Sequence, residues 1–197
     1  MFVNKTRFRK LVKEAFNSGY GLIVGKVYGG LVVCGGTWTT WTEEGYVPNW
    51  VKAAVMEHTG ELPKEGHVFR AKKDEPIQYE IADNRYFDLP GTFMRAKNPF
   101  TVTPMVYDNK WKHFRFLQND ATKEIIAVQS YLYELLDMKE LGEENRPVGP
   151  SAETRSGGVL IWKNEHSAVA ICKLDISGDS LDVMELLAEY EFKKEDF

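Results

Sequence analysis

The stretch "YGLIVGKVYGGLVVCGG", residues 20–36, decides the fold class, because two apolar runs meet there at Tyr28-Gly29-Gly30. Apolar, β-branched runs that meet at a glycine pair are typical of an antiparallel hairpin. The overlapping stretch "CGGTWTTWTEEGYVPNW", residues 34–50, then brings three tryptophans within seventeen positions. The sequence therefore predicts a sheet here, and it raises the question of whether the tryptophans fill a core or contact a partner.

Amphipathic helical patterns lie on both sides of this predicted hairpin. Asn4 is a suitable cap for a helix over residues 5–17, where apolar residues recur at a spacing of three and four. Pro48 favours the start of a second helix over residues 49–59, and Gly60 ends that pattern. The first half thus has the order helix, hairpin, helix.

The second half shows the same order in its pattern of apolar residues. A helix is expected from about residue 120 to 141, a hairpin over residues 157–176 and a closing helix over residues 177–192. We therefore expect an α+β fold with two pseudo-repeated helix–hairpin–helix halves, residues 1–99 and 100–197, packed as one compact unit. The sheets should be mainly antiparallel, with the helices on one side.

Composition and charge limit the function. The chain has 197 residues and a net charge of -4, which divides into +3 over residues 1–100 and -7 over residues 101–197. Any nucleic-acid footprint must therefore be local, because binders of nucleic acid usually carry a concentrated basic surface.

No apolar run is long enough for a membrane span, so we expect a cytoplasmic protein without membrane contact. Cys34 and Cys172 lie in apolar runs, which favours buried reduced thiols.

The first helical pattern carries a basic stripe. At 100° per residue, four basic residues fall within about 140° of one another beside the apolar face. This stripe is either a solvated helix face or a phosphate-binding face. The residues are Lys5, Arg9, Lys10 and Lys13.

The segment "KWKHFRF", residues 110–116, mixes aromatic and basic residues. In an extended strand Trp111, His113 and Arg115 share one face. The composition is that of a base-stacking platform, and equally that of a half-buried edge strand. We take these three residues as further candidates for nucleic-acid contact.

The closing helical pattern has the opposite charge. Asp182, Glu185 and Glu189 lie within about 60° of one another on the helix. Such a stripe repels phosphate, so it is a candidate surface for a basic protein partner.

The tryptophans of residues 34–50 also concern binding. If this stretch is extended, Trp38 and Trp41 point to opposite faces, and a sheet with one solvated side cannot bury both. We expect Trp50 and one of these two to be core and the other to be exposed at a partner-binding surface. Burial of all three is the alternative.

No pattern of catalytic or metal-binding residues is present. The four histidines lack the spacing of metal-binding helices, and two isolated cysteines do not form the usual zinc pairs. We therefore expect no metal, no cofactor and no catalytic residue.

The order of elements supports a resemblance to a known family. The segments "VPNWVKAAVMEHTGELPKEGHVF" and "GGVLIWKNEHSAVAICKLDI" carry this order in the two halves, which resembles small proteins of phages and mobile elements. Those proteins are similar to the repeated helix-and-sheet unit of DNA sliding clamps, whose helices face DNA with positive charge. The basic stripe of the first helix matches this positive charge, and the acidic stripe of the last helix departs from it.

These observations lead to one main hypothesis and two alternatives. The main hypothesis is a non-enzymatic binding module of a phage or mobile element that acts on nucleic acid or on a nucleic-acid-processing protein. The first alternative is an inhibitor or adaptor that binds a basic host protein through its acidic second half. The second is a small-molecule enzyme whose site the sequence does not reveal. Each hypothesis allows a homodimer.

Overall fold

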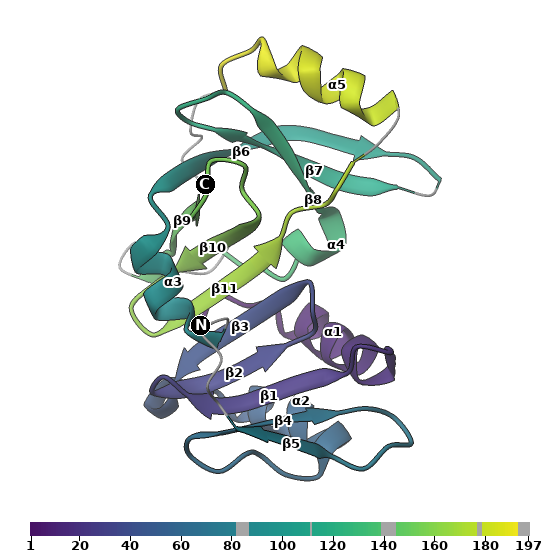
Figure 1. Cartoon of the computed structure of the whole chain (residues 1–197), viewed down its shortest axis with the longest axis vertical. Helices are drawn as coiled ribbons and strands as arrows, with labels where there is room; N and C mark the ends of the chain where they lie inside the picture. Colours follow the sequence, from purple (N-terminus) through teal and green to yellow (C-terminus); the bar gives the residue numbers. More distant parts are fainter. Residues whose placement is uncertain (82–86, 111, 139–144, 177–178, 193–197) are drawn as a thin grey trace.

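The fold is built on one antiparallel sheet in a computed structural model that describes residues 1–81, 87–110, 112–138, 145–176 and 179–192. The strands are β1 (Leu22–Val27), β2 (Gly30–Cys34), β3 (Trp38–Glu43), β4 (His67–Ala71), β5 (Gln78–Ile81), β6 (Asn98–Asp108), β7 (His113–Asn119), β8 (Ile125–Gln129), β9 (Val148–Ala152), β10 (Val159–Lys163) and β11 (Ser167–Cys172). Over the described residues their order is β5-β4-β1-β2-β3-β11-β10-β9-β6-β7-β8 (Figure 1). The predicted α+β class with an antiparallel sheet is thus confirmed.

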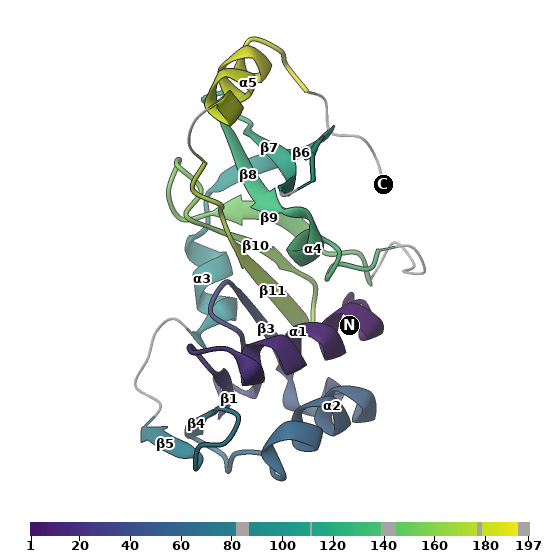
Figure 2. The ribbon, with the colours of Figure 1, turned by 90° about the vertical axis from the view of Figure 1, so that its right-hand side faces the viewer.

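Helices cover both faces of this sheet. They are α1 (Lys5–Asn17), α2 (Asn49–Thr59), α3 (Leu89–Arg95), α4 (Ser130–Tyr133) and α5 (Asp179–Ala188), with a short 3-10 helix at Glu44–Tyr46. One face packs against α1, α2 and α4, whereas α3 and α5 pack on the other (Figure 2). The prediction of helices on one side is wrong, because strands such as β2 are apolar and buried on both faces and both faces need cover.

The first half forms largely as predicted. The Asn4 side chain caps α1 by accepting a hydrogen bond from the backbone N–H of Arg7 at 2.9 Å. Tyr28 and Gly29 have positive φ angles of 54° and 72° in the hairpin between β1 and β2, and Gly60 ends α2 in the left-handed region. These local signals act over a few residues, which explains why the sequence alone was sufficient for them.

The second half departs from the expected helix–hairpin–helix order. The helix predicted over residues 120–141 is wrong, because Asn119 closes a turn through its side chain and the β-branched run that follows pairs with β7 as β8. Only the short α4 follows before residues 139–144, which lie outside the described residues. The pseudo-repeat of the two halves is therefore not confirmed. The division at residues 99 and 100 stays a prediction.

A proline within a strand pattern predicts either an edge strand or a bulge, and Pro104 lies within β6. The register of β6 against β7 shifts between Val102 and Val106, which is the bulge that a proline inside a strand requires. The bulge lies at the base of the β6–β7 hairpin, which carries His113 and Arg115.

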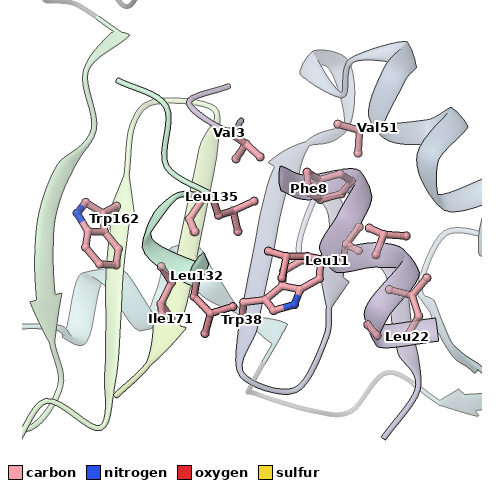
Figure 3. Packing of buried hydrophobic residues seen from close by; sticks show 14 of the residues in the cluster. Val3, Phe8, Leu11, Leu22, Trp38, Val51, Leu132, Leu135, Trp162 and Ile171 are labelled. Atoms are coloured by element: carbon pink, nitrogen blue, oxygen red, sulfur yellow. The ribbon is translucent and has the colours of Figure 1, made fainter. Parts of the chain in front are cut away.

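The main core lies between the sheet and the helices α1, α2 and α4. Trp38 lies there between Leu11 of α1 and Leu132 of α4 (Figure 3). Strand β3 pairs with β11 over five residues, from Thr42 opposite Ser167 to Trp38 opposite Ile171. The same cluster therefore contains side chains from both ends of the chain.

The tryptophans differ from the prediction. Trp38 and Trp41 point to opposite faces, as the extended backbone requires, yet both are buried, with exposed fractions of 3% and 6%. Trp50 is only half-buried, against Phe8. The expected exposure of Trp38 or Trp41 is wrong, because the sheet is covered on both faces where β3 crosses it.

The structure also describes the two cysteines and the apolar character of the helices. Cys34 and Cys172 are free thiols; Cys34 is buried and Cys172 is half-buried. In the part of the chain that the structure describes, no helix combines the length and the apolar character that crossing a membrane requires.

Candidate nucleic-acid interface

The outward face of α1 is basic. Helix α1 buries Phe8, Leu11, Val12 and Ala15 against the sheet, so its charged residues face away from it. Four exposed cations lie there, and we call them the α1 basic face: Lys5, Arg9, Lys10 and Lys13. The predicted stripe is therefore exposed on one side of the molecule.

Most of this charge is uncompensated. Among the described residues Lys5, Arg9 and Lys13 form no ion pair, and Lys10 has only a loose contact of 3.9 Å with Glu14. Helix α1 has no acidic residue in its first turn, although the N-terminus of a helix favours negative charge. A basic first turn works against the helix dipole, so the stability of the helix does not account for this charge.

The chain before α1 fixes this helix against α4. Val3 forms an antiparallel bridge with Leu136, and the backbone N–H of Asn4 donates to the carbonyl of Leu135 at 2.8 Å. Arg7, on the side of α1 that faces α4, forms an ion pair with Glu134. Helix α1 is therefore held beside the residues that follow α4.

A groove runs across α4 from α1 to the β6–β7 hairpin. It consists of two adjoining hollows of about 890 and 420 Å³, which share Arg115, Tyr133 and Glu134. We call it the α4 groove. The first hollow is lined by Asn4, Thr6, Arg7, Lys10, Leu136, Asp137 and Met138 besides the shared residues, and the second by Val106, Asp108, His113, Ser130 and Tyr131.

The groove unites residues that are far apart in the sequence. Lys10 of the basic face and the hairpin candidates His113 and Arg115 all line it. Strand β7 places His113 and Arg115 on the α4 side of the sheet, because Phe114 and Phe116 point to the other side and pack against α5. Trp111, the third hairpin candidate, lies outside the described residues.

Arg115 lies at the junction of the two hollows. Its guanidinium carbon lies 4.7 Å from the centre of the Tyr133 ring, and its Nη1 donates a long hydrogen bond of 3.4 Å to the carbonyl of Thr103. Two acidic side chains of the groove have other partners, since Glu134 pairs with Arg7 and Asp108 pairs with His113. The third, Asp137, lines the first hollow together with Arg115 and forms no ion pair with it. Arg115 is thus half-buried without a carboxylate partner among the described residues.

Two tyrosines give the groove an aromatic surface that stays neutral. Burial raises the pKa of Tyr133, an effect that the nearby Arg115 partly offsets. Burial also raises the pKa of Tyr131, and the charge of Glu14 adds to that shift. Neither phenol therefore adds negative charge to the groove at neutral pH.

The acidic candidates lie on a separate surface. Helix α5 packs Val183, Met184 and Leu187 against the sheet. Its opposite face exposes the three predicted acidic residues, together with Leu186, whose exposed fraction is 61%. The acidic residues are Asp182, Glu185 and Glu189. Because α5 lies on the other face of the sheet from α1, their role toward a basic protein stays a prediction separate from the basic face.

Sequence reasoning missed several residues of the groove. Tyr131, Tyr133 and Glu134 were expected inside a long helix, and only the strand β8 before them places them beside α1. Arg7 does not belong to the predicted stripe, and it lines the groove because it pairs with Glu134. In the described part of the chain no three His, Cys, Asp or Glu side chains gather as metal ligands.

Comparisons with known proteins assign no family. No protein-family model matches the chain, and no curated protein matches its sequence. Among solved structures, the chain is similar to the beta chain of DNA polymerase III from Streptococcus pneumoniae TIGR4, at 7% identity and a TM-score of 0.34. The alignment covers 92% of this chain and 66% of that chain. Similarity at this level assigns no function, and the link to phages or mobile elements stays a prediction.

Proposed function

We propose that this protein is a binding module that holds nucleic acid against the α1 basic face and the adjoining α4 groove. The observation that carries the proposal is the uncompensated charge of the basic face, where Lys5, Arg9 and Lys13 form no ion pair among the described residues. Cations without partners on one exposed face favour a ligand with regularly spaced negative charges. The phosphate backbone of nucleic acid is such a ligand.

The distribution of charge also favours one orientation. The chain as a whole is negative, with a net charge of -4, so nucleic acid should approach only where positive charge is concentrated. The acidic face of α5 lies on the opposite side of the sheet and repels phosphate. The α1 side is therefore the favoured contact surface.

The test measures binding of a fluorescent oligonucleotide by anisotropy at several salt concentrations. The double variant Arg9→Ala/Lys13→Ala should weaken binding and reduce the slope of log K against log salt by about 2, since each phosphate-contacting cation contributes roughly 1 to that slope. The matched control is Lys73→Ala/Lys97→Ala, which removes the same charge from exposed positions outside α1 and the groove. Equal affinity and slope in wild type and the α1 variant would contradict the proposal.

A further inference from the structure

Arg115 is a cation of the α4 groove that has no carboxylate partner among the described residues. Arg115 is half-buried, and the described residues provide its guanidinium with one carbonyl and one aromatic ring but no carboxylate. Removing a cation from water is unfavourable unless an anion or several hydrogen-bond acceptors replace the lost hydration. The planar guanidinium has five N–H donors, and phosphate oxygens fit it well. No carboxylate among the described residues pairs with Arg115, so its guanidinium has N–H donors left for an anionic ligand.

The aromatic residues narrow the class of ligand. Tyr131 has an exposed fraction of 39% and lines the groove beside His113, while the Tyr133 ring lies under Arg115. A free phosphate would not use an exposed ring, whereas a nucleobase stacks on one. The two hollows have volumes of about 890 and 420 Å³, which is in the size range of ligand pockets, and both are open to solvent.

The geometry favours a single strand over a duplex. In a duplex the bases stack on each other and hide their faces, so Tyr131 would find no base to contact. The phosphates of a duplex lie on a stiff outer surface, which adapts less readily than a single strand to the two hollows of the groove. A single strand can turn one base and its phosphate into the groove. Its backbone can then leave along Lys10, which belongs both to the groove and to the α1 basic face.

We propose that the α4 groove binds single-stranded nucleic acid, with a base on Tyr131 and a phosphate at Arg115. This inference rests on the proposed function and specifies its ligand. The α1 basic face supplies charge for any nucleic acid, and the groove selects the unpaired strand.

The test compares a labelled oligothymidine with a duplex of the same length by fluorescence anisotropy. The single strand should bind at least about tenfold more tightly than the duplex. Tyr131→Leu, which removes the ring but keeps apolar bulk, should weaken single-strand binding by about tenfold and leave duplex binding unchanged. Arg115→Gln should have a similar effect. Tyr190→Leu is the matched control, because Tyr190 is 65% exposed and lies beyond α5 on the other face.

The outcomes separate this inference from the proposed function. Equal binding of both ligands, weakened alike by Arg9→Ala/Lys13→Ala and unaffected by Tyr131→Leu, would overturn the groove assignment and leave the proposed function standing. Absence of binding to either oligonucleotide would overturn both. Binding of a polyglutamate peptide that is lost in Arg115→Gln, without oligonucleotide binding, would assign the groove to an acidic protein segment instead. Thermal melting of each variant by circular dichroism shows whether it is folded.

Discussion

Trp38 and Trp41 show how single residues depend on the layers around them. The Trp38 indole packs against Gly35, and the Trp41 indole packs against Gly30. A side chain at either glycine would collide with the ring, because its Cβ would lie 2.3 Å from Nε1 of Trp38 or 2.6 Å from Nε1 of Trp41. The Trp41 indole also donates a hydrogen bond of 3.2 Å to the carbonyl of Tyr28. The glycines of the opening stretch therefore make room for two buried rings on opposite faces of one strand.

We predict that Trp38→Ala and Trp41→Ala each destabilise the protein by roughly 3–5 kcal/mol, because both truncate a large buried side chain. Trp50→Ala should destabilise it less, since Trp50 is only half-buried. Urea denaturation followed by circular dichroism measures the three free energies of unfolding. A variant at position 38 or 41 as stable as the wild type would show that its indole does not contribute to the core.

At the scale of elements, α1 combines strong local signals with a charge pattern that opposes its stability. The Asn4 cap and the apolar face favour the helix, but Lys5 places positive charge at its first position. Lys5 is exposed and forms no ion pair among the described residues. Its position therefore does not contribute to the stability of the helix, and under the proposed function it contacts an anion.

We predict that Lys5→Glu stabilises the fold and weakens nucleic-acid binding. A carboxylate at the first helical position interacts favourably with the helix dipole, by about 0.3–1 kcal/mol, and it can pair with Arg9 four residues later. The melting temperature should rise while the anisotropy titration shows lower affinity. A variant that is more stable and binds nucleic acid as well as the wild type would remove Lys5 from the interface.

The segment after β7 is the element where sequence and structure differ most. Residues 120–141 contain helix-forming and β-branched residues together, and the periodicity alone favoured a helix. These residues form a strand instead of a helix, because the run that begins at Ile125 pairs with the edge of β7 as β8. The short α4 that follows then lies beside α1, and this placement creates the groove.

At the scale of the molecule, one sheet connects both ends of the chain. The pairing of β3 with β11 joins the first five strands to the remaining six, and we call this pairing the seam of the sheet. The main core contains side chains from both sides of the seam. The sheet also separates the charges, because α1, which carries the basic face, packs on one side of it and α5, which carries the acidic residues, packs on the other. The two surfaces can therefore contact different molecules without competing for space.

We predict that the protein unfolds in a single cooperative transition, because neither group of strands can expose its edge at the seam without losing part of the shared core. Differential scanning calorimetry should give equal calorimetric and van't Hoff enthalpies. Val169→Ala, which weakens the seam within β11, should lower the midpoint of that one transition. Two resolved transitions would instead support two halves that fold independently.

The sequence by itself determined the features that depend on neighbours along the chain. The cap at Asn4, the stop at Gly60, the hairpin at Tyr28-Gly29 and the bulge at Pro104 follow from backbone preferences of a few residues. The exposed stripe on α1 follows from helical periodicity in the same way. These features needed no knowledge of distant segments.

Only the tertiary structure decided the features that depend on distant segments. The burial of Trp41 requires α3 and its flanking residues on the second face of the sheet, and β8 requires the edge of β7. The α4 groove requires α1, β7 and α4 to meet, and within it Glu134 and Asp108 pair with Arg7 and His113 rather than with Arg115. Burial and electrostatic pairing are properties of the space around a side chain, and that space is filled by residues far away in the sequence.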